Sequence, residues 1–430
     1  MRKLFACLLI AASAAANDLS YRSLQSGGFA TPLHDRGLHG QGQIIAVLDT
    51  GLDYSSCYFA EPGNSPPPVN TGTQSGGLAW QNIDLTRRKV VAYDFLYSCD
   101  QFPGASGCDQ PDNPAAWDNA RHGTLAAAAA AGDRGSFLFH DAADSIAPGA
   151  KLIIQDGGFI GGDFCAQRPG FGCPVQLTPI LDQAYKQGAR IHSNSWGDRQ
   201  GTPSVLPSPT ANYPESARDA DAFIAAHPDL LVVFNTGNFS SSTGTPPASS
   251  VSAPGSAKNV IQVGGTRAYY SDGASFTQRD DTVLANFTLR GPTRDGRIKP
   301  DLVGPSLVTL GDALPSVANP HCDTTFQQGT SWSSPTVAGA GALVRQYYTT
   351  GYYPRGVATP QHAITPSAAL LKATLIAAAR PVETIVYGDG REIAAQPVPS
   401  YEQGFGFPVL DDALYFSGDE ARLRVVDSSN

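Results

Sequence analysis

Charged side chains are scarce in this 430-residue chain. Asp, Glu, Lys and Arg make up 16% of it, against 41% apolar residues. The chain therefore has ample material for a core and lacks the charge-rich composition of a disordered protein. An excess of basic residues is also missing, since the formal net charge is -9. This acidic balance argues against nucleic acid or an anionic membrane as a partner.

Long apolar runs are absent from nearly the whole sequence. The exception is the amino terminus, where Arg2 and Lys3 precede the apolar stretch 4–12 and small residues end at Ala16. This pattern predicts a secretory signal peptide over residues 1–16. No other run approaches the roughly 20 residues that a membrane-spanning helix needs. We therefore expect a secreted, extracellular protein without a membrane anchor.

Paired Cys-x-x-Cys and Cys/His patterns, which are typical of zinc sites, are also absent. Of the seven cysteines, Cys7 lies in the predicted signal peptide, which leaves an even number. In an exported chain this favours disulfides, although six cysteines allow 15 pairings. Sequence proximity and elimination predict the pairs Cys99–Cys108, Cys165–Cys173 and Cys57–Cys322.

Apolar stretches that are present predict alternating strands and helices. We expect buried strands over 43–49, 89–95, 151–155, 189–193 and 230–235, and helices over 125–131, 177–187 and 217–226. Such alternation is typical of an α/β fold with three α/β/α layers and a mainly parallel central sheet. Apart from its strand, the Pro- and Gly-rich stretch 54–118 is interpreted as surface insertions.

Several polar residues follow the predicted strands, at the sheet edge where parallel α/β folds place their sites. Asp49, in Asp49-Thr50-Gly51, ends the first strand. Asp-Thr-Gly also marks aspartic proteases, but these pair two such carboxylates and no second copy is found. Asn238 follows the strand 230–235 and offers a neutral amide donor suited to an oxyanion, or else serves as a turn residue.

Two further candidates lie at predicted helix starts. His122 precedes the alanine-rich helix, where a lone histidine is usually structural. Ser331 follows Gly329-Thr330, and we expect its helix to begin near Ser331 because Pro335 is tolerated only in a first turn. The hydroxyl would then lie where helix amides favour negative charge. Taken alone, Gly-Thr-Ser more often only caps a helix through Thr330 and Ser331.

Taken together, these residues resemble the subtilisin-like serine proteases, or subtilases. The resemblance spans about Gly40 to Asp412 and rests on blocks in the family's order. These blocks are Asp49-Thr50-Gly51, His122-Gly123-Thr124, Ser195-Trp196-Gly197, Gly237-Asn238, and Gly329-Thr330-Ser331 with Pro335. Further blocks at 252–259, 290–292 and 295–301 resemble the large alkaline proteases that carry an extra C-terminal β-domain.

The resemblance implies a serine endopeptidase in which Ser331 attacks, His122 carries the proton and Asp49 orients the imidazole. Asn238 and the Ser331 amide would hold the oxyanion. Substrate-binding roles are implied for Ser195, Trp196, Gly197, Gly237, Gly157 and Gly158. We expect no metal or other cofactor in the chemistry. Family members often bind structural calcium, but we assign no loop of this sequence to it.

Several residues depart from the family pattern. Arg121 stands where the family usually has Gly, Ala128 replaces a Gly, and Trp332 follows the nucleophile where Met is usual. In addition, Val303-Gly304-Pro305-Ser306 stands for the family's Met-Ala-Pro-Gly. None of these changes removes a catalytic atom. They leave open a second function, a subtilase-fold protein that binds peptides without efficiently cutting them.

The resemblance also sets the expected organisation and partners. Residues 17–417 would form the catalytic domain, with 17–39 as its lead-in, and 418–430 a tail with a strand over 421–426 that starts a truncated β-domain. The short lead-in predicts folding without a pro-segment or a sequence incomplete there. We expect a monomer that cleaves proteins or peptides after large apolar residues, because Ser195-Trp196-Gly197 and Thr236-Gly237 bring no charge to the pocket walls. The pocket floor is expected within 239–251.

Overall fold

The computed structural model describes residues 16–28, 30–71, 78–96, 121–135, 141, 143–157, 177–197, 213–239, 246–267, 281–311, 321–386 and 391–427. Within these ranges, no helix combines the length and the apolar composition that crossing a membrane requires. The predicted signal peptide lies outside them except for Ala16, as do the cysteines of the two predicted short disulfides.

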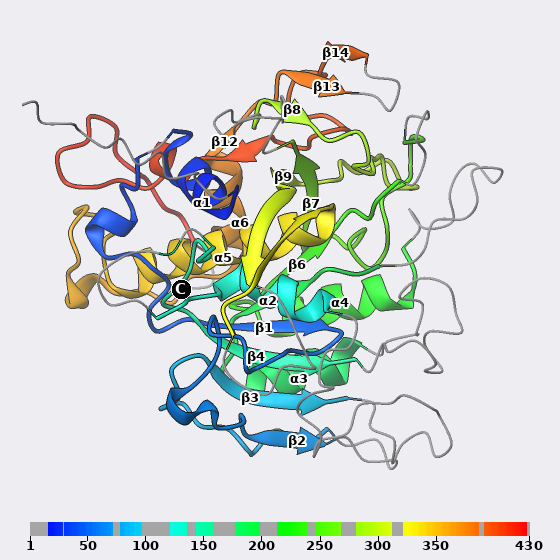
Figure 1. Cartoon of the computed structure of the whole chain (residues 1–430). Coiled ribbons are helices and arrows are strands. Elements are labelled where there is room, and N and C mark those ends of the chain that lie inside the picture. The colour runs from blue at the N-terminus through cyan, green and yellow to red at the C-terminus, as the bar shows by residue number, and fades with distance from the viewer. Residues whose placement is uncertain are drawn as a thin grey trace, which may run out of the picture.

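A large sheet runs through the middle of the molecule (Figure 1). Its strands are β1 (Ile44–Asp49), β2 (Val69–Thr71), β3 (Val90–Phe95), β4 (Lys151–Asp156), β5 (Ile191–Asn194), β6 (Leu231–Asn235), β7 (Ile261–Thr266), β8 (Val283–Leu284), β9 (Leu302–Pro305), β13 (Thr384–Val386) and β14 (Glu392–Ala394). In the described part of the chain the order is β14-β13-β8-β7-β6-β5-β1-β4-β3-β2, with β9 also paired to β7. Among these described strands only β7/β8 and β13/β14 are antiparallel, which confirms a mainly parallel sheet.

Helices cover both faces of this sheet. They are α1 (Ala16–Ser26), α2 (His122–Ala131), α3 (Leu177–Lys186), α4 (Glu215–Ala226), α5 (Thr330–Thr349) and α6 (Ala368–Ala377). Helix α5 packs against α2, α6 and the strands β5 to β7, whereas α3 packs against α4. Ile45 and Val47 of β1 belong to the main core, but Ala46 joins a smaller core with Ala184 of α3. Because alternate side chains of a strand point to opposite faces, α3 and α5 lie on opposite sides, as in the predicted three-layer fold.

Shorter elements surround this framework. A hairpin pairs β10 (Leu307–Gly311) with β11 (Thr324–Gln328), directly before α5, and β12 (Ala379–Arg380) pairs with β15 (Phe407–Pro408). Short 3-10 helices are η1 (His34–Arg36), η2 (Pro62–Asn64), η5 (Pro360–His362) and η6 (Leu410–Asp412). The hairpin therefore leads the chain directly to the first residue of α5.

The predicted strands β1, β3, β4, β5 and β6 and the helices α2 to α5 are confirmed to within a few residues. The interpretation of 54–118 as surface insertions is only partly right among the described residues. Residues 62–66 and 81–86 lie mainly at the surface, but Tyr58 and Phe59 are buried in the core, and β2 extends the sheet. The strand expected over 421–426 is also wrong. These residues form no regular structure, and Val426 is 81% exposed, because no described strand pairs with them.

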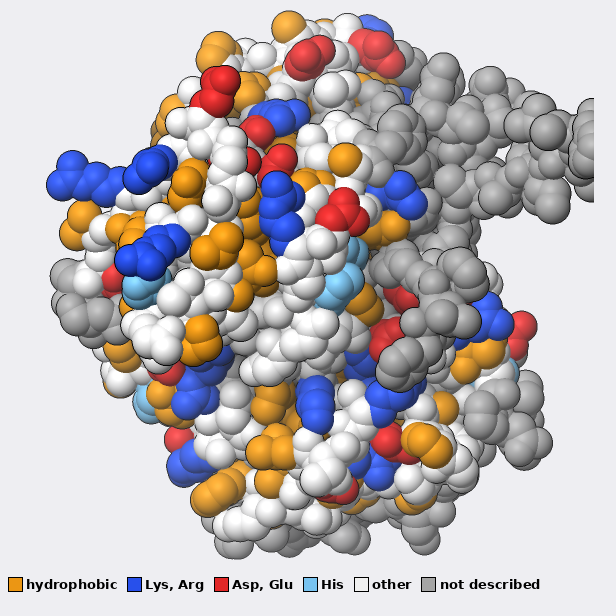
Figure 2. Space-filling view, turned by 90° about the vertical axis from the view of Figure 1, so that its left-hand side faces the viewer, with side chains coloured by type: hydrophobic (Ala, Val, Ile, Leu, Met, Phe, Trp, Pro, Cys, Tyr) orange, Lys and Arg blue, Asp and Glu red, His pale blue; other side chains and the backbone are white. Residues whose placement is uncertain are grey.

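The surface mixes charges of both signs. On the face shown in Figure 2, acidic and basic side chains are scattered among hydrophobic and neutral ones, without one large patch of a single kind. Several of the carboxylates are neutralised locally, for example in the Arg380–Asp412 and Arg190–Asp229 ion pairs. The negative net charge is therefore not gathered into one acidic region on that face.

Candidate active site

The predicted site residues meet at the carboxyl edge of three neighbouring strands. β1 ends at Asp49, β5 ends at Asn194 and β6 ends at Asn235, and β5 lies between the other two. Ser195 and Asn238 follow β5 and β6, so they reach the same edge. Parallel strands present their carboxyl ends together, which is why segments far apart in the sequence converge here.

Asp49 and His122 are joined by a hydrogen bond. The imidazole Nδ1 lies 2.7 Å from Asp49 Oδ1, which also accepts the backbone N–H of Thr50 at 2.8 Å. Asp49 is 1% exposed, and its Oδ2 has no hydrogen-bond partner within the described residues. An ionised carboxylate can only accept hydrogen bonds, so in this pair His122 Nδ1 is the donor and the bond orients the imidazole ring.

The start of α2 is held against the turn after β1. The N–H of Gly123 donates to Thr50 Oγ1 at 2.7 Å, and a Cβ atom on Gly123 would overlap the carbonyl oxygen of Gly51. Residue 123 must therefore be glycine for α2 to approach so closely. The preceding Arg121 has a φ of 63°, in the left-handed region that glycine adopts most easily. The Gly-to-Arg departure thus falls on a strained backbone position.

Ser331 is the second residue of α5 and is 8% exposed. Its hydroxyl donates a long hydrogen bond of 3.5 Å to the carbonyl oxygen of Ser195. In return, Ser195 Oγ donates to the carbonyl oxygen of Ser331 at 2.7 Å. In a regular helix that carbonyl would accept the N–H of residue 335, but Pro335 has none. The side chain of Ser195 therefore replaces this missing helix bond. Its implied place in a pocket wall stays a prediction.

Asn238 is tied to the start of the same helix. Its Oδ1 accepts the backbone N–H of Thr330 at 2.9 Å and the Thr330 hydroxyl at 3.0 Å. The amide oxygen therefore faces Thr330, and Nδ2 remains as the donor end of the side chain. This orientation is what a neutral donor toward a developing negative charge requires.

Trp332 joins α5 to the histidine. Its ring centroid lies 4.9 Å from that of His122, with the planes inclined at 40°. The residue directly after Ser331 therefore packs against the imidazole, and this brings the helix start and His122 into one site. The sequence marked Trp332 only as a departure from the family, because nothing in the sequence indicates which ring it contacts.

The residues expected to bind substrate are arranged around Ser252. A Cβ atom on Gly197 would lie 2.6 Å from Ser252 Oγ, and one on Gly237 would lie 3.6 Å from the same atom. Ser252 is 2% exposed, and its Oγ has no partner within the described residues. The polar side chain between the two glycines thus lies one residue beyond the stretch 239–251 in which the pocket floor was expected.

The other residues expected to bind substrate, Trp196, Gly157 and Gly158, lie in different surroundings. Trp196 is 4% exposed and packs edge-on against Phe234. The N–H of Gly157 donates to the carbonyl oxygen of Asp49 at 2.9 Å, which fixes it beside β1. Gly158 lies outside the described residues. Trp196 therefore packs into the core at this edge of the sheet.

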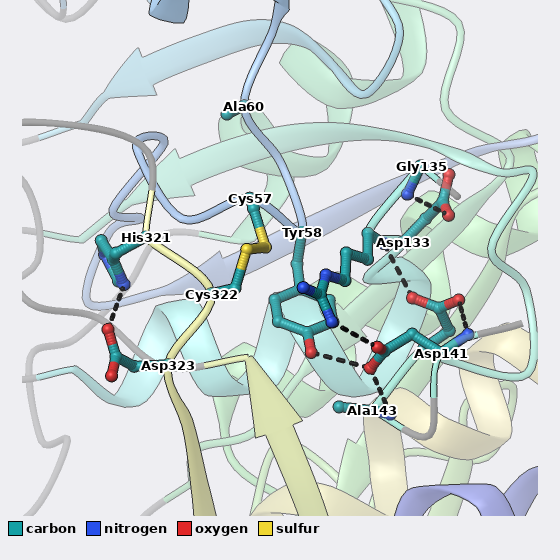
Figure 3. The surroundings of a disulfide bond; sticks show 12 residues. Cys57, Tyr58, Ala60, Asp133, Gly135, Asp141, Ala143, His321, Cys322 and Asp323 are labelled. Atoms are coloured by element: carbon teal, nitrogen blue, oxygen red, sulfur yellow. Dashed lines mark hydrogen bonds and ion pairs between the residues drawn. A yellow bond between two sulfur atoms is a disulfide. The ribbon is translucent and has the colours of Figure 1, made fainter. Parts of the chain in front are cut away.

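A disulfide joins the segment after β1 to the segment before β11, as Figure 3 shows. It links Cys57 to Cys322, with 5.2 Å between their Cα atoms, as predicted. The N–H of Cys57 donates to the carbonyl oxygen of His321 at 2.7 Å, and His321 Nε2 lies 3.0 Å from Asp53 Oδ2. The turn that follows Asp49 is thus fastened to the strand pair that leads to Ser331.

Behind the site, β5 contains a neutral histidine. His192 is fully buried; its Nε2 lies 2.8 Å from Gln155 Oε1 and its Nδ1 lies 3.0 Å from Asn194 Nδ2. Burial lowers the pKa of His192 to about 3.

Clusters of metal-binding side chains are absent from the described ranges. No group of three or more His, Cys, Asp or Glu side chains in them could hold an ion.

The fold and the site define a class of protein: a three-layer α/β domain with Asp, His, Asn and Ser at one sheet edge, in the order found in subtilisin-like proteins. The family model for Peptidase S8, the subtilase family, matches residues 40–406. The chain therefore belongs to the subtilase family.

Individual relatives are distant. The chain is 25% identical to the serine protease/ABC transporter B family protein tagD of Dictyostelium discoideum, over 79% of this chain and 20% of that protein. It is 26% identical to Mycosin-3 of Mycobacterium tuberculosis (strain ATCC 25618 / H37Rv), over 72% of this chain and 59% of that protein. The chain spans only about a fifth of the length of the Dictyostelium relatives it matches.

Solved structures show the same fold. The Clostridium perfringens CspB protease aligns with a TM-score of 0.55 at 15% identity, covering 91% of this chain and 96% of that one. Fervidolysin from Fervidobacterium pennivorans aligns with a TM-score of 0.52 at 17% identity, covering 96% and 49%. At such identities the likeness establishes the architecture alone.

Proposed function

We propose that the chain is a secreted serine endopeptidase that hydrolyses peptide bonds through Asp49, His122 and Ser331. The 2.7 Å bond between Asp49 and His122, beside the start of the helix that carries Ser331, is the observation that carries this proposal. Membership of the subtilase family supports a serine peptidase. Secretion is proposed from the pattern of residues 1–16.

The first step is attack by Ser331 Oγ on the scissile carbonyl. The hydroxyl turns from its 3.5 Å bond with Ser195 and gives its proton to His122 Nε2. The buried Asp49 carboxylate stabilises the imidazolium that forms. His122 then protonates the leaving amine, and water releases the acyl group from Ser331 by the reverse sequence.

The negative oxygen of the tetrahedral intermediate needs donors that are already in place. Asn238 Nδ2 is suitable because Thr330 holds the Oδ1 end of that amide. The N–H of Ser331 belongs to the first turn of α5, where N–H groups have no partner within the helix. Both donors are neutral and fixed, so little reorganisation accompanies the charge.

Active-site labelling tests this proposal. Wild-type protein should react with a fluorophosphonate at one residue, and Ser331→Ala should abolish both labelling and peptide cleavage. Ser331→Ala, His122→Ala and the double variant should each lose roughly 10⁶-fold in kcat, because the two side chains act as one unit. A double variant far slower than either single variant would contradict the mechanism.

The alternative is a subtilase-fold protein that binds peptides with impaired cleavage. The strained backbone at Arg121, directly before His122, is the observation that favours it. In that case folded wild-type protein would bind a peptide but would show neither labelling nor turnover. Restoring glycine at position 121 would then raise activity, whereas an efficient enzyme should change little.

For specificity we propose cleavage after large apolar residues. The atoms nearest to a Cβ on Gly197 or Gly237 belong to Ser252, Ala253 and Leu289, and none of these residues carries a charge to pair with a charged substrate side chain. Burying an unpaired charge there would cost several kcal/mol. A peptide library profile dominated by Arg or Glu at the first position would refute this preference.

A further inference from the structure

Trp332 carries a hydrogen-bond donor for which the described part of the chain supplies no acceptor. The residue is 4% exposed, and its indole Nε1 is buried with no hydrogen-bond partner within the described residues. Buried donors are nearly always paired, because leaving one unpaired destabilises the folded protein. Subtilases usually have Met at this position, and a Met side chain has no hydrogen-bond donor that needs an acceptor.

The unpaired donor lies next to Asn238. A Cβ atom on Gly329 would lie 3.5 Å from Asn238 Nδ2, 3.7 Å from Trp332 Nε1 and 3.8 Å from Asn238 Oδ1, so the two nitrogens approach the same point beside Gly329. Gly329 directly precedes α5, whose first turn also contains the N–H of Ser331. Three N–H groups therefore gather at the helix start, where the helix dipole favours negative charge.

We propose that the Trp332 indole N–H is a third donor to the oxyanion, beside Asn238 Nδ2 and the Ser331 N–H. This inference rests on the proposed function, because the oxyanion forms only if Ser331 attacks a carbonyl. A donor that has no partner among the described residues gains one when negative charge appears on the carbonyl oxygen. Its contribution therefore favours the transition state over bound substrate and raises kcat rather than affinity.

The indole has two separable features. Its ring packs on His122 in a tilted arrangement, with the ring centroids 4.9 Å apart, while its nitrogen lies near Asn238 beside Gly329. Trp332→Phe keeps an aromatic face and removes the N–H. Trp332→Met removes both, and gives a second variant without the donor if the phenylalanine variant folds poorly.

The test compares kcat, ground-state affinity and affinity for a tetrahedral adduct. Trp332→Phe and Trp332→Met should lower kcat about 10- to 100-fold, the range for a hydrogen bond to a charged group. A peptide aldehyde, which forms a tetrahedral adduct with the serine, should bind more weakly by a similar factor. In a Ser331→Ala background, affinity for the uncleaved peptide should be the same with and without Trp332→Phe.

Tyr347→Phe is a matched control on the same helix. It also removes one buried aromatic donor, whose hydroxyl donates to the Tyr415 carbonyl oxygen at 2.7 Å, at a position remote from the helix start. It should leave kcat unchanged. Active-site titration normalises all rates to folded enzyme.

Two outcomes would overturn the inference while leaving the peptidase intact. One is a kcat within twofold of wild type in a folded Trp332→Phe variant. The other is a lower kcat with unchanged aldehyde affinity, which would assign Trp332 to positioning His122. If the wild type itself neither cleaves peptide nor takes the fluorophosphonate, the proposed function fails, and the inference with it.

Discussion

Replacing Ser195 with alanine should destabilise the start of α5. Ser195 Oγ donates to the carbonyl oxygen of Ser331 at 2.7 Å, and Pro335 cannot supply the N–H that would normally pair with that carbonyl. Because Ser331 is 8% exposed, water has little access to the carbonyl once the hydroxyl is gone. A buried polar group left unpaired costs about 1–3 kcal/mol, so we expect the free energy of unfolding to fall by about 2 kcal/mol.

Urea unfolding in a Ser331→Ala background measures this change without self-digestion. The decisive comparison adds Pro335→Ala, which restores an N–H four residues after the orphaned carbonyl. Ser195→Ala should cost clearly less in that background, because the helix can now form the missing bond. The reasoning would be refuted if Ser195→Ala lowered the free energy of unfolding by less than about 0.5 kcal/mol in the protein that keeps Pro335, as an ordinary surface substitution does. It would also be refuted if Ser195→Ala lowered that free energy equally in the proteins with Pro335 and with Pro335→Ala.

Ser334→Ala is a control for removing a neighbouring hydroxyl. Ser334 Oγ lies 3.2 Å from Ser195 Oγ and 3.3 Å from the Asn194 carbonyl oxygen, both longer contacts than the Ser195–Ser331 bond. Its removal leaves the Ser331 carbonyl paired with Ser195. We therefore expect Ser334→Ala to lower the free energy of unfolding by less than half as much as Ser195→Ala. If both variants lowered it equally, the unpaired Ser331 carbonyl would not be the cause of the effect.

Three further changes have defined outcomes. Arg121→Gly should stabilise by about 0.5–1 kcal/mol in thermal or urea unfolding, because it relieves a φ of 63°, whereas Arg121→Ala should not. Gly339→Ala should destabilise by about 1–3 kcal/mol, since its Cβ would lie 2.7 Å from the Ala130 carbonyl oxygen; a neutral result would mean that α2 and α5 separate easily. His192 has a pKa of about 3 when folded and 6.5 as the reference, so the unfolded state binds more protons and stability falls as pH drops from 6.5 toward 3. His192→Gln should reduce the slope of the unfolding free energy against pH by up to about 1.4 kcal/mol per pH unit. If the slope is unchanged, other titrating groups cause the pH dependence.

Strands β1, β4 and β6 were predictable because their environment is simple. Each is buried on both faces and contains an apolar run that ends at a polar residue. Those run ends also predicted where the site lies, since parallel strands present their carboxyl ends at one edge. Short elements such as β2 were missed because three residues carry too little periodicity.

The contacts within the site depend on tertiary structure. Pro335 indicates the helix start from the sequence alone, because it removes a helix hydrogen bond, but nothing in the sequence indicates that Ser195 replaces that bond. Likewise, Trp332 is visible as an unusual residue, yet its packing on His122 follows from the approach of α5 to α2. Gly339 permits that approach, and its role becomes clear only when both helices are in place.

The Cys57–Cys322 disulfide covalently links two positions that are 265 residues apart in the sequence. Asp49 lies just before one half-cystine and Ser331 just after the other. A single cut in any loop between the two cysteines would therefore leave both residues in one covalently joined molecule. Such nicked material would migrate as a single species on a denaturing gel and would separate into two fragments only after a thiol is added.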